Sequence, residues 1–312
     1  MAQSNQSPVM NDNYPNTFRA LDETRTNGRN QIFEPALAHF PRAFRLADSA
    51  TSHERLEWEL IRSEVRAHLL HLVAQSRWKN HLVLRGSVLL HSWFGVAARE
   101  PQDLDWVFQP HTVKLGDPDC EACFAEITEL IKNNPSTQNA RILTEKIASD
   151  DIWTYERAQG RRLVFPYENA EGAGREIQMD IVWGEALPEP PVITSFPQRD
   201  GSSIELWAAT PQLSLAWKLL WLATDMHAQG KDLYDAVLLA EHIHLPFALL
   251  RQVFDGDEWF SQREINPFTF SDSELSVDWD NFQLEFPWIE GTGKQWLNRL
   301  ILALASTWSE AK

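Results

Sequence analysis

The sequence predicts an α/β (α+β) protein in which a mixed sheet with flanking helices is followed by a mainly helical C-terminal domain. Residues 103–108 and 176–183 alternate between apolar and polar side chains, as strands with one buried face do. Beyond the proline-rich segment 187–197, apolar residues recur at helical spacing instead. This change of period indicates two structural regions within the chain.

The elements of the first region follow in chain order. Residues 1–30 are rich in Asn, Ser, Thr and Gln, so we expect a flexible or extended arm over 1–50. Residues 53–78 carry apolar side chains at near-helical spacing and predict a long amphipathic helix. The pattern then predicts helices at 88–94 and 120–132 and strands at 81–84, 103–108, 141–147, 162–167 and 176–183.

The segment 187–197 contains four prolines and is the best candidate for a domain boundary. We therefore predict an arm at 1–50, a catalytic domain at 51–190 and a helical domain at 191–312. Helices are expected at 211–225, 231–244, 246–254 and 294–308. Residues 255–290 are acidic and aromatic, and we interpret them as an irregular cap packed on the helices. Binding to a basic surface of a partner is the alternative.

Two carboxylates stand side by side on the predicted strand 103–108. Because side chains alternate along a strand, Asp103 and Asp105 project from one face while Leu104 and Trp106 fill the other. Carboxylates held so close repel each other unless they share a proton or bind a divalent metal. Hard oxygen ligands suit Mg²⁺, which keeps several waters and bridges to substrate phosphates.

Two further features strengthen a metal and phosphate site. Asp180 lies on the polar face of the second alternating strand, and three strand acids could hold two metals. Gly86 and Ser87 connect a short buried strand to an apolar helix. Glycine allows close backbone approach, and the free N–H groups at a helix start favour a phosphate.

These residues resemble the nucleotidyltransferase-fold superfamily. The segment Arg99-Glu-Pro-Gln-Asp103-Leu-Asp105 is similar to the Arg-x-x-Ser/Thr-x-Asp-Ile-Asp pattern of AbiEii/AbiGii toxin-like nucleotidyltransferases. Residues 209–218, which end in Lys218, and 230–235, which read Gly-Lys-Asp-Leu-Tyr-Asp, look like that family's later motifs. The resemblance covers roughly residues 82–250. It departs from the family at the first motif, which lacks one glycine, and at Gln229, where an arginine is common.

The resemblance implies Mg²⁺-dependent transfer of a nucleoside monophosphate from a nucleoside triphosphate to an acceptor hydroxyl, with release of pyrophosphate. Asp103 and Asp105 would ligate the metal. Asp180 would complete a second metal site or activate the attacking hydroxyl. The family further implies a toxin of a bacterial toxin–antitoxin or phage-defence pair, with a cognate antitoxin and with tRNA 3′ ends or a protein hydroxyl as acceptor.

The phosphate-binding roles also come from the resemblance. Gly86 and Ser87, with the nearby backbone N–H groups, would hold the terminal phosphates. Arg99 and Lys231 would contact phosphates as well. Lys218 would neutralise charge on the departing pyrophosphate. Asp232 would act as a base or orient Lys218.

Each feature has a structural alternative. An isolated Asp-Leu-Asp is often a strand end with solvated acids, and a lysine in an apolar helix such as Lys218 often snorkels to water. Asp232 and Asp235 could be a helix N-cap and a surface charge. The cysteine pair, Cys120 and Cys123, lacks a second ligand pair for zinc, so two unremarkable thiols are favoured over a redox pair.

Composition excludes some classes of function. A net charge of -16 argues against a general nucleic-acid binder, although a local basic surface is open. No apolar run reaches the roughly 20 residues of a membrane span, and the polar start lacks a signal-peptide core, so we expect a soluble cytoplasmic protein without a membrane partner. Candidates for the basic surface are Arg62, Arg66, Arg77, Lys79, Arg85, Arg141, Lys146, Arg157, Arg161, Arg162 and Arg175.

Two alternative functions stay open. A small-molecule nucleotidyltransferase that modifies an antibiotic or metabolite would share the metal site but have an acidic acceptor pocket, which the net charge favours. A non-catalytic protein of the same fold would bind nucleotide or a partner without turnover.

Overall fold

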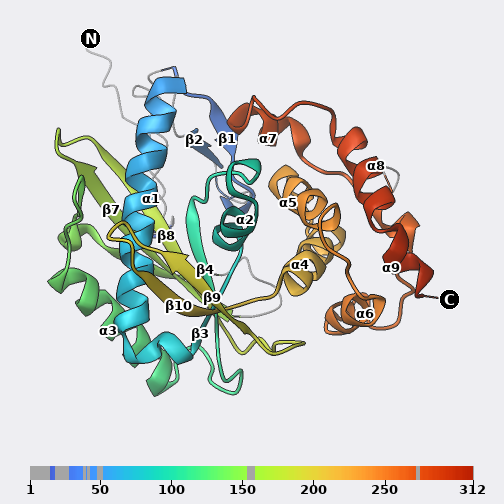
Figure 1. Cartoon of the computed structure of the whole chain (residues 1–312), viewed down its shortest axis with the longest axis horizontal. Helices are drawn as coiled ribbons and strands as arrows, with labels where there is room; N and C mark the ends of the chain where they lie inside the picture. The colour runs from blue at the N-terminus through green and yellow to red at the C-terminus, as the bar shows by residue number, and fades with distance from the viewer. Residues whose placement is uncertain are drawn as a thin grey trace, which may run out of the picture.

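The computed structural model describes residues 15–17, 28–37, 40, 43–47, 52–152, 159–271 and 275–311. Its centre is an eight-stranded mixed sheet with the order β5-β7-β8-β4-β3-β10-β9, in which β6 pairs with β7 (Figure 1). The strands are β3 (Leu82–Arg85), β4 (Asp103–Phe108), β5 (Ala140–Ile142), β6 (Ala148–Ile152), β7 (Gln159–Asn169), β8 (Gly174–Trp183), β9 (Val192–Pro197) and β10 (Ser203–Ala208).

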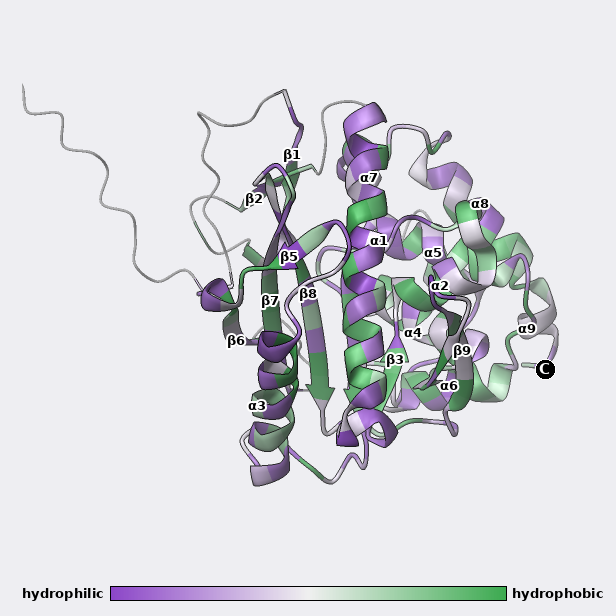
Figure 2. Ribbon diagram, turned by 60° about the vertical axis from the view of Figure 1, so that its left-hand side comes forward, coloured by the Kyte–Doolittle hydropathy of each residue, from purple (hydrophilic) through white to green (hydrophobic). Residues whose placement is uncertain are grey.

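Helices cover the sheet because its strands are apolar. The long helix α1 (Ser52–Gln75) and α3 (Pro118–Asn133) cross the sheet near β7 and β8 (Figure 1). Both helices carry hydrophilic residues among hydrophobic ones, whereas β3 and much of β8 are hydrophobic (Figure 2). The short helix α2 (Ser87–Phe94) packs on β3 and β4 and also contacts the helical region.

The helical region follows the sheet and packs beside α2 (Figure 1). It consists of α4 (Pro211–Thr224), α5 (Gly230–Ala240), α6 (Phe247–Asp255), α7 (Trp279–Glu285), α8 (Gly293–Ala303) and α9 (Ala305–Ser309), with the short 3₁₀ helix η6 (Pro267–Phe270) between α6 and α7. The fold class expected from the sequence, a mixed sheet followed by helices, is therefore confirmed.

Two expectations about the sheet need correction. The predicted strand 141–147 is β5, then the 3₁₀ helix η5 (Thr144–Lys146), then β6. Both strands pair with β7, and six chain positions separate Ile142 from Ala148 while their partners Tyr167 and Val164 are only three apart. The extra residues between β5 and β6 cannot all pair with β7, and three of them form η5. Strand β9 ends on the last of the four prolines, Pro197, and β10 follows it, yet both strands belong to the same sheet, so the helical part begins at Pro211.

The described part of the N-terminal arm contains a ribbon of two antiparallel strands, β1 (Gln31–Phe33) and β2 (Phe44–Leu46). The rest of the expected arm, residues 1–14, 18–27, 38–39, 41–42 and 48–50, lies outside the described residues. In the acidic aromatic segment, packing is confirmed for Phe260, Phe270, Trp279, Phe282 and Phe286, which are buried, whereas Trp259, Phe268 and Trp288 are exposed.

Cys120 and Cys123 are buried free thiols of α3, and burial raises the pKa of both. Such thiols are unreactive packing groups. Within the described chain, no helix is long and apolar enough to cross a bilayer.

Candidate active site

A glycine makes the turn between β3 and α2 fit beside the β4 acids. Gly86 has φ of 81°, a conformation that side-chain-bearing residues rarely adopt. A Cβ at this position would lie 2.3 Å from Oδ2 of Asp105. The backbone therefore approaches the carboxylate to a distance that only glycine allows.

Replacing Gly86 with alanine is expected to displace Asp105, reduce nucleotidyl transfer by about a hundredfold and destabilise the protein by about 1–3 kcal/mol. Gly116→Ala is the matched control, because Gly116 has φ of 88° but a Cβ there would meet no atom within 4 Å. Steady-state kinetics would measure the effect of each substitution on activity, and urea unfolding its effect on stability. If both variants lost only stability, and equally, the close approach to Asp105 would have no role in activity.

The three strand acids converge as the alternating patterns indicated. Asp103 and Asp105 lie half-buried on one face of β4, and Asp105 is paired in register with Asp180 on the parallel strand β8. The Ser87 hydroxyl, in the first turn of α2, donates a hydrogen bond of 3.2 Å to Oδ1 of Asp103. The start of α2 thus faces the carboxylates, where a phosphate and a metal would meet.

Asp180 is engaged by a residue that the sequence did not pair with it. Arg162 on β7 lies opposite Asp180 and donates from Nε and Nη2 to its two carboxylate oxygens at 2.8 and 2.7 Å. This bidentate pair fixes the Asp180 carboxylate and gives it a positively charged partner. A metal could use Asp180 only by sharing it with Arg162.

The two β4 acids have opposite electrostatic environments. Burial, together with the negative charges of Asp103 and Asp180, raises the pKa of Asp105 to about 7. Burial also raises the pKa of Asp103, but Lys231 and Arg99 lead a set of cations that outweigh it and hold this pKa below its usual value. Within the described chain, no group donates a hydrogen bond to the side-chain carboxylate of Asp105. The site therefore carries a carboxylate whose negative charge is poorly compensated.

The carboxylate oxygens of Asp103 and Asp105 fit Mg²⁺ when the substrate supplies part of the metal's coordination shell. Among residues the structure describes, no three His, Cys, Asp or Glu side chains form a ready metal cage. Magnesium does not need one, because it commonly takes one or two carboxylates and completes its octahedron with water and substrate phosphates. Asp103 and Asp105 supply such a pair of oxygen donors.

A buried network links the helical region to the acids. Lys218 of α4 donates a hydrogen bond of 2.7 Å to Oδ1 of Asp232 and lies 3.1 Å from Oδ2 of Asp235, both on α5. Arg99 donates to the same Asp235 from Nε and Nη2. Desolvation lowers the pKa of Lys218, but Asp232 and Asp235 outweigh it and raise the value, so the ammonium stays protonated. The two cations therefore share one aspartate.

This network overturns two structural alternatives. Lys218 is buried and ion-paired, so it does not snorkel to water. Asp235 is 0% exposed, so the interpretation as a surface charge is wrong. Its pKa is raised by burial and lowered more strongly by Arg99 and Lys218, with the net result that the carboxylate stays ionised.

A family model described as the nucleotidyl transferase AbiEii toxin of type IV toxin–antitoxin systems matches residues 67–290. The match spans the Gly86 turn, the β4 acids and the network on α4 and α5. The chain belongs to the AbiEii family. The AbiEii-family protein is therefore a nucleotidyltransferase toxin, as the motifs indicated.

A solved nucleotidyltransferase toxin shares the fold of this AbiEii-family toxin. The nucleotidyltransferase toxin MenT4 of Mycobacterium tuberculosis has a TM-score of 0.54 and 17% sequence identity over 77% of this chain and 80% of that chain. A protein of H. pylori solved as a candidate nucleotidyltransferase has a TM-score of 0.49 and 14% identity over 80% of this chain and 93% of that chain. No curated protein matches the sequence.

Arg99 and Lys231 of the AbiEii-family toxin differ in burial and in ion pairing. Arg99 was expected to contact a phosphate, but it is buried and committed to Asp235, so its charge reaches Asp103 through space. Lys231 is half-buried, and its side-chain ammonium forms no hydrogen bond or ion pair within the described residues. Lys231 is therefore the better candidate for a direct phosphate contact.

Sequence reasoning missed Asp235 and the Asp180–Arg162 pair. Asp232 and Asp235 are three residues apart on one helix, which places them on the same face, and this spacing was an available signal. No local signal exists for Arg162, because strand pairing between β7 and β8 joins residues 18 positions apart.

Most of the predicted basic surface is neutralised. Carboxylates pair with six of its members, in the pairs Arg66–Glu100, Arg77–Glu126, Arg85–Glu185, Arg161–Asp151, Arg162–Asp180 and Arg175–Glu54. Arg62 is buried, whereas Lys79, Arg141 and Lys146 are not. Arg157 lies outside the described residues. Six of the ten described members therefore have a carboxylate as a charge partner.

Proposed function

We propose that this AbiEii-family toxin transfers a nucleoside monophosphate from a nucleoside triphosphate to an acceptor hydroxyl, on a tRNA 3′ end or a protein side chain, using Mg²⁺ at Asp103 and Asp105. The observation that carries the proposal is the crowding of these two acids against the Gly86 turn, where burial and the neighbouring carboxylates raise the pKa of Asp105. Metal and phosphate chemistry is the ordinary use of such an arrangement.

The protein groups have distinct parts in this reaction. Ser87 and the backbone N–H groups at the start of α2 bind the terminal phosphates. Lys231 contacts them from the first turn of α5. Bound Mg²⁺ would supply Lewis-acid stabilisation of the phosphate oxygens.

Lys218 stays protonated beside the acids and compensates charge on the leaving pyrophosphate. Asp232 accepts a hydrogen bond from Lys218, which favours its role as the group that orients the lysine over a role as base. The family's toxin–antitoxin context supports a cognate antitoxin as the biological partner.

A second candidate is transfer to a small cationic acceptor, such as an antibiotic or metabolite. The net charge of -16 and the ion pairing of the arginines favour it, because both reduce attraction for a polyanionic RNA. It keeps the same nucleotide site and changes only the acceptor. A non-catalytic nucleotide-binding role is the remaining alternative.

Incubation with each α-labelled triphosphate, Mg²⁺ and separate cellular RNA, protein and small-molecule fractions tests the proposal. We expect the wild type to label RNA or protein, and the Asp103→Ala/Asp105→Ala variant to label nothing. Asp200→Ala, an exposed aspartate after β9, is the control for lost charge. Label in the small-molecule fraction alone would establish the second candidate. No transfer and no metal-dependent nucleotide binding would contradict both.

Expression in cells separates the biological roles. A transferase toxin should arrest growth, and Asp103→Ala should relieve the arrest. Unchanged growth with both versions would contradict the proposed macromolecular acceptor.

A further inference from the structure

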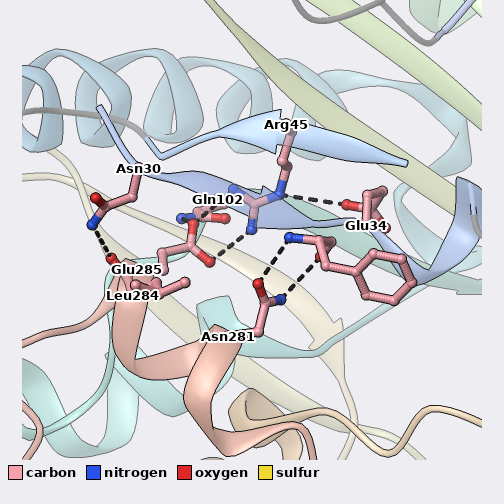
Figure 3. A network of polar contacts seen from close by, with 8 residues as sticks. Asn30, Glu34, Arg45, Gln102, Asn281, Leu284 and Glu285 are labelled. Atoms are coloured by element: carbon pink, nitrogen blue, oxygen red, sulfur yellow. Dashed lines mark hydrogen bonds and ion pairs between the residues drawn. The ribbon is translucent and has the colours of Figure 1, made fainter. Parts of the chain in front are cut away.

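The N-terminal ribbon lies outside the part of the chain that the family model matches, yet it binds a helix inside that part. The backbone N–H of Phe33 donates to Oδ1 of Asn281 at 2.8 Å, and Nδ2 of Asn281 donates to the Phe33 carbonyl at 3.0 Å (Figure 3). Asn30 donates from Nδ2 to the Leu284 carbonyl at 2.9 Å. The ribbon and the residue before it therefore bind α7 at two positions, Asn281 and Leu284.

Glu285, the last residue of α7, joins the ribbon to the catalytic sheet. Arg45 of β2 donates to both of its carboxylate oxygens at 2.8 and 2.6 Å, and Gln102 donates to Oε1 at 2.8 Å (Figure 3). Burial raises the pKa of Glu285, but Arg45 and Gln102 outweigh it and lower the value to about 2. Gln102 directly precedes Asp103, so the ionised carboxylate of Glu285 binds the residue immediately before strand β4.

The other end of α7 holds the start of α5. The Asp278 backbone N–H donates to the Ala228 carbonyl at 2.9 Å, and Asp278 forms a bridge with Gln229. A Cβ on Gly230 would lie 2.4 Å from Cβ of Phe282, so α7 packs directly on the residue before Lys231. One short helix therefore connects the Lys231 turn to the Asp103 strand.

We infer that the N-terminal ribbon is a strap that fixes the first turn of α5 relative to the acids of β4 through α7, with Arg45, Asn281 and Glu285 as positioning residues. The inference rests on the proposed function of Lys231 and Asp103. Nucleotidyl transfer depends on alignment, so a small displacement of the phosphate-binding turn slows the reaction without removing any reacting group.

Arg45→Met, Glu285→Gln and Asn281→Ala test the strap. We expect kcat to fall about tenfold in each variant, because a loosened α5 misaligns the phosphates. Arg45→Lys, which keeps the charge, should recover part of the loss. The matched control is Arg299→Met/Glu241→Gln, which removes another bidentate arginine–glutamate pair, joined at 2.8 Å between α8 and the far end of α5. Its kcat should equal that of the wild type.

Hydrogen exchange supplies a readout independent of activity. The amides of Asp232 and Leu233 donate to the Gln229 carbonyl in the first turn of α5. In Arg45→Met these amides should exchange at least several-fold faster, along with that of Phe33, and in the control they should not.

Unchanged exchange at Asp232 and Leu233 in Arg45→Met would overturn the strap, whether or not the Phe33 amide is freed. A kcat equal to that of the control would overturn it too. A wild type without transferase activity would instead contradict the proposed function, and the exchange data would still decide whether the ribbon holds α5.

Discussion

Replacing Asp105 with asparagine is expected to reduce nucleotidyl transfer by about a thousandfold while making the nucleotide-free protein more stable at neutral pH. Activity falls because the metal and the phosphates lose one of two carboxylate ligands. Stability rises because the substitution removes a negative charge that burial disfavours and that Asp103 and Asp180 repel in the folded state. Such opposite effects are characteristic of a group kept for function at the expense of stability.

The same residue determines how stability depends on pH. The pKa of Asp105 is about 7 in the folded chain against an ordinary value of 3.8, so the folded state retains a proton that the unfolded state has lost. The proton on Asp105 therefore contributes to the free energy of unfolding in full below about pH 4, and this contribution is lost as the pH rises through about 7. Contact with solvent reduces the effect of this shift to about 2 kcal/mol at neutral pH.

Urea unfolding of the wild type and of Asp105→Asn from pH 4 to pH 8 measures this effect. We expect the difference between the two to grow from about pH 4 and to level off above about pH 7, since the asparagine cannot titrate. Millimolar Mg²⁺ should stabilise the wild type at pH 8 and have little effect on the variant. A variant less stable than the wild type at pH 8 would contradict the charge repulsion.

Asp235→Asn is expected to destabilise the protein by about 3–5 kcal/mol, the cost of breaking a buried ion pair. The carboxylate is fully buried and is shared by Arg99 and Lys218, so its neutralisation leaves Arg99 without a carboxylate partner among the described residues and leaves Lys218 paired with Asp232. Transfer should also slow, because Lys218 loses one of the groups that hold it near the leaving pyrophosphate.

Glu126→Gln is the control for Asp235→Asn. Glu126 pairs with Arg77, but the side chains are 46% and 63% exposed, so water screens the pair and its loss should destabilise the protein far less than Asp235→Asn does. Denaturant midpoints with unchanged slopes would give both values. Equal losses in the two variants would show that Asp235 acts as an ordinary surface charge.

Local patterns in the sequence were sufficient to predict the part of the site that β4 and the Gly86–Ser87 turn form. Alternation placed Asp103 and Asp105 on one face of a strand, and the change from strand to helical period located the Gly86–Ser87 turn. The motif spacing was also sufficient for the family, which the match over residues 67–290 establishes. These properties depend on residues a few positions apart, whose geometry the backbone period fixes.

Only the tertiary structure decided which partner each charge has. The engagement of Asp180 by Arg162, the sharing of Asp235 by Arg99 and Lys218, and the binding of α7 by the N-terminal ribbon join residues from 17 to about 250 positions apart. The same holds for β10, which pairs in parallel with β3 across more than a hundred residues. Periodicity determines which face a side chain occupies, but strand order and helix packing determine what lies opposite that face, because those contacts form only when distant segments are buried together.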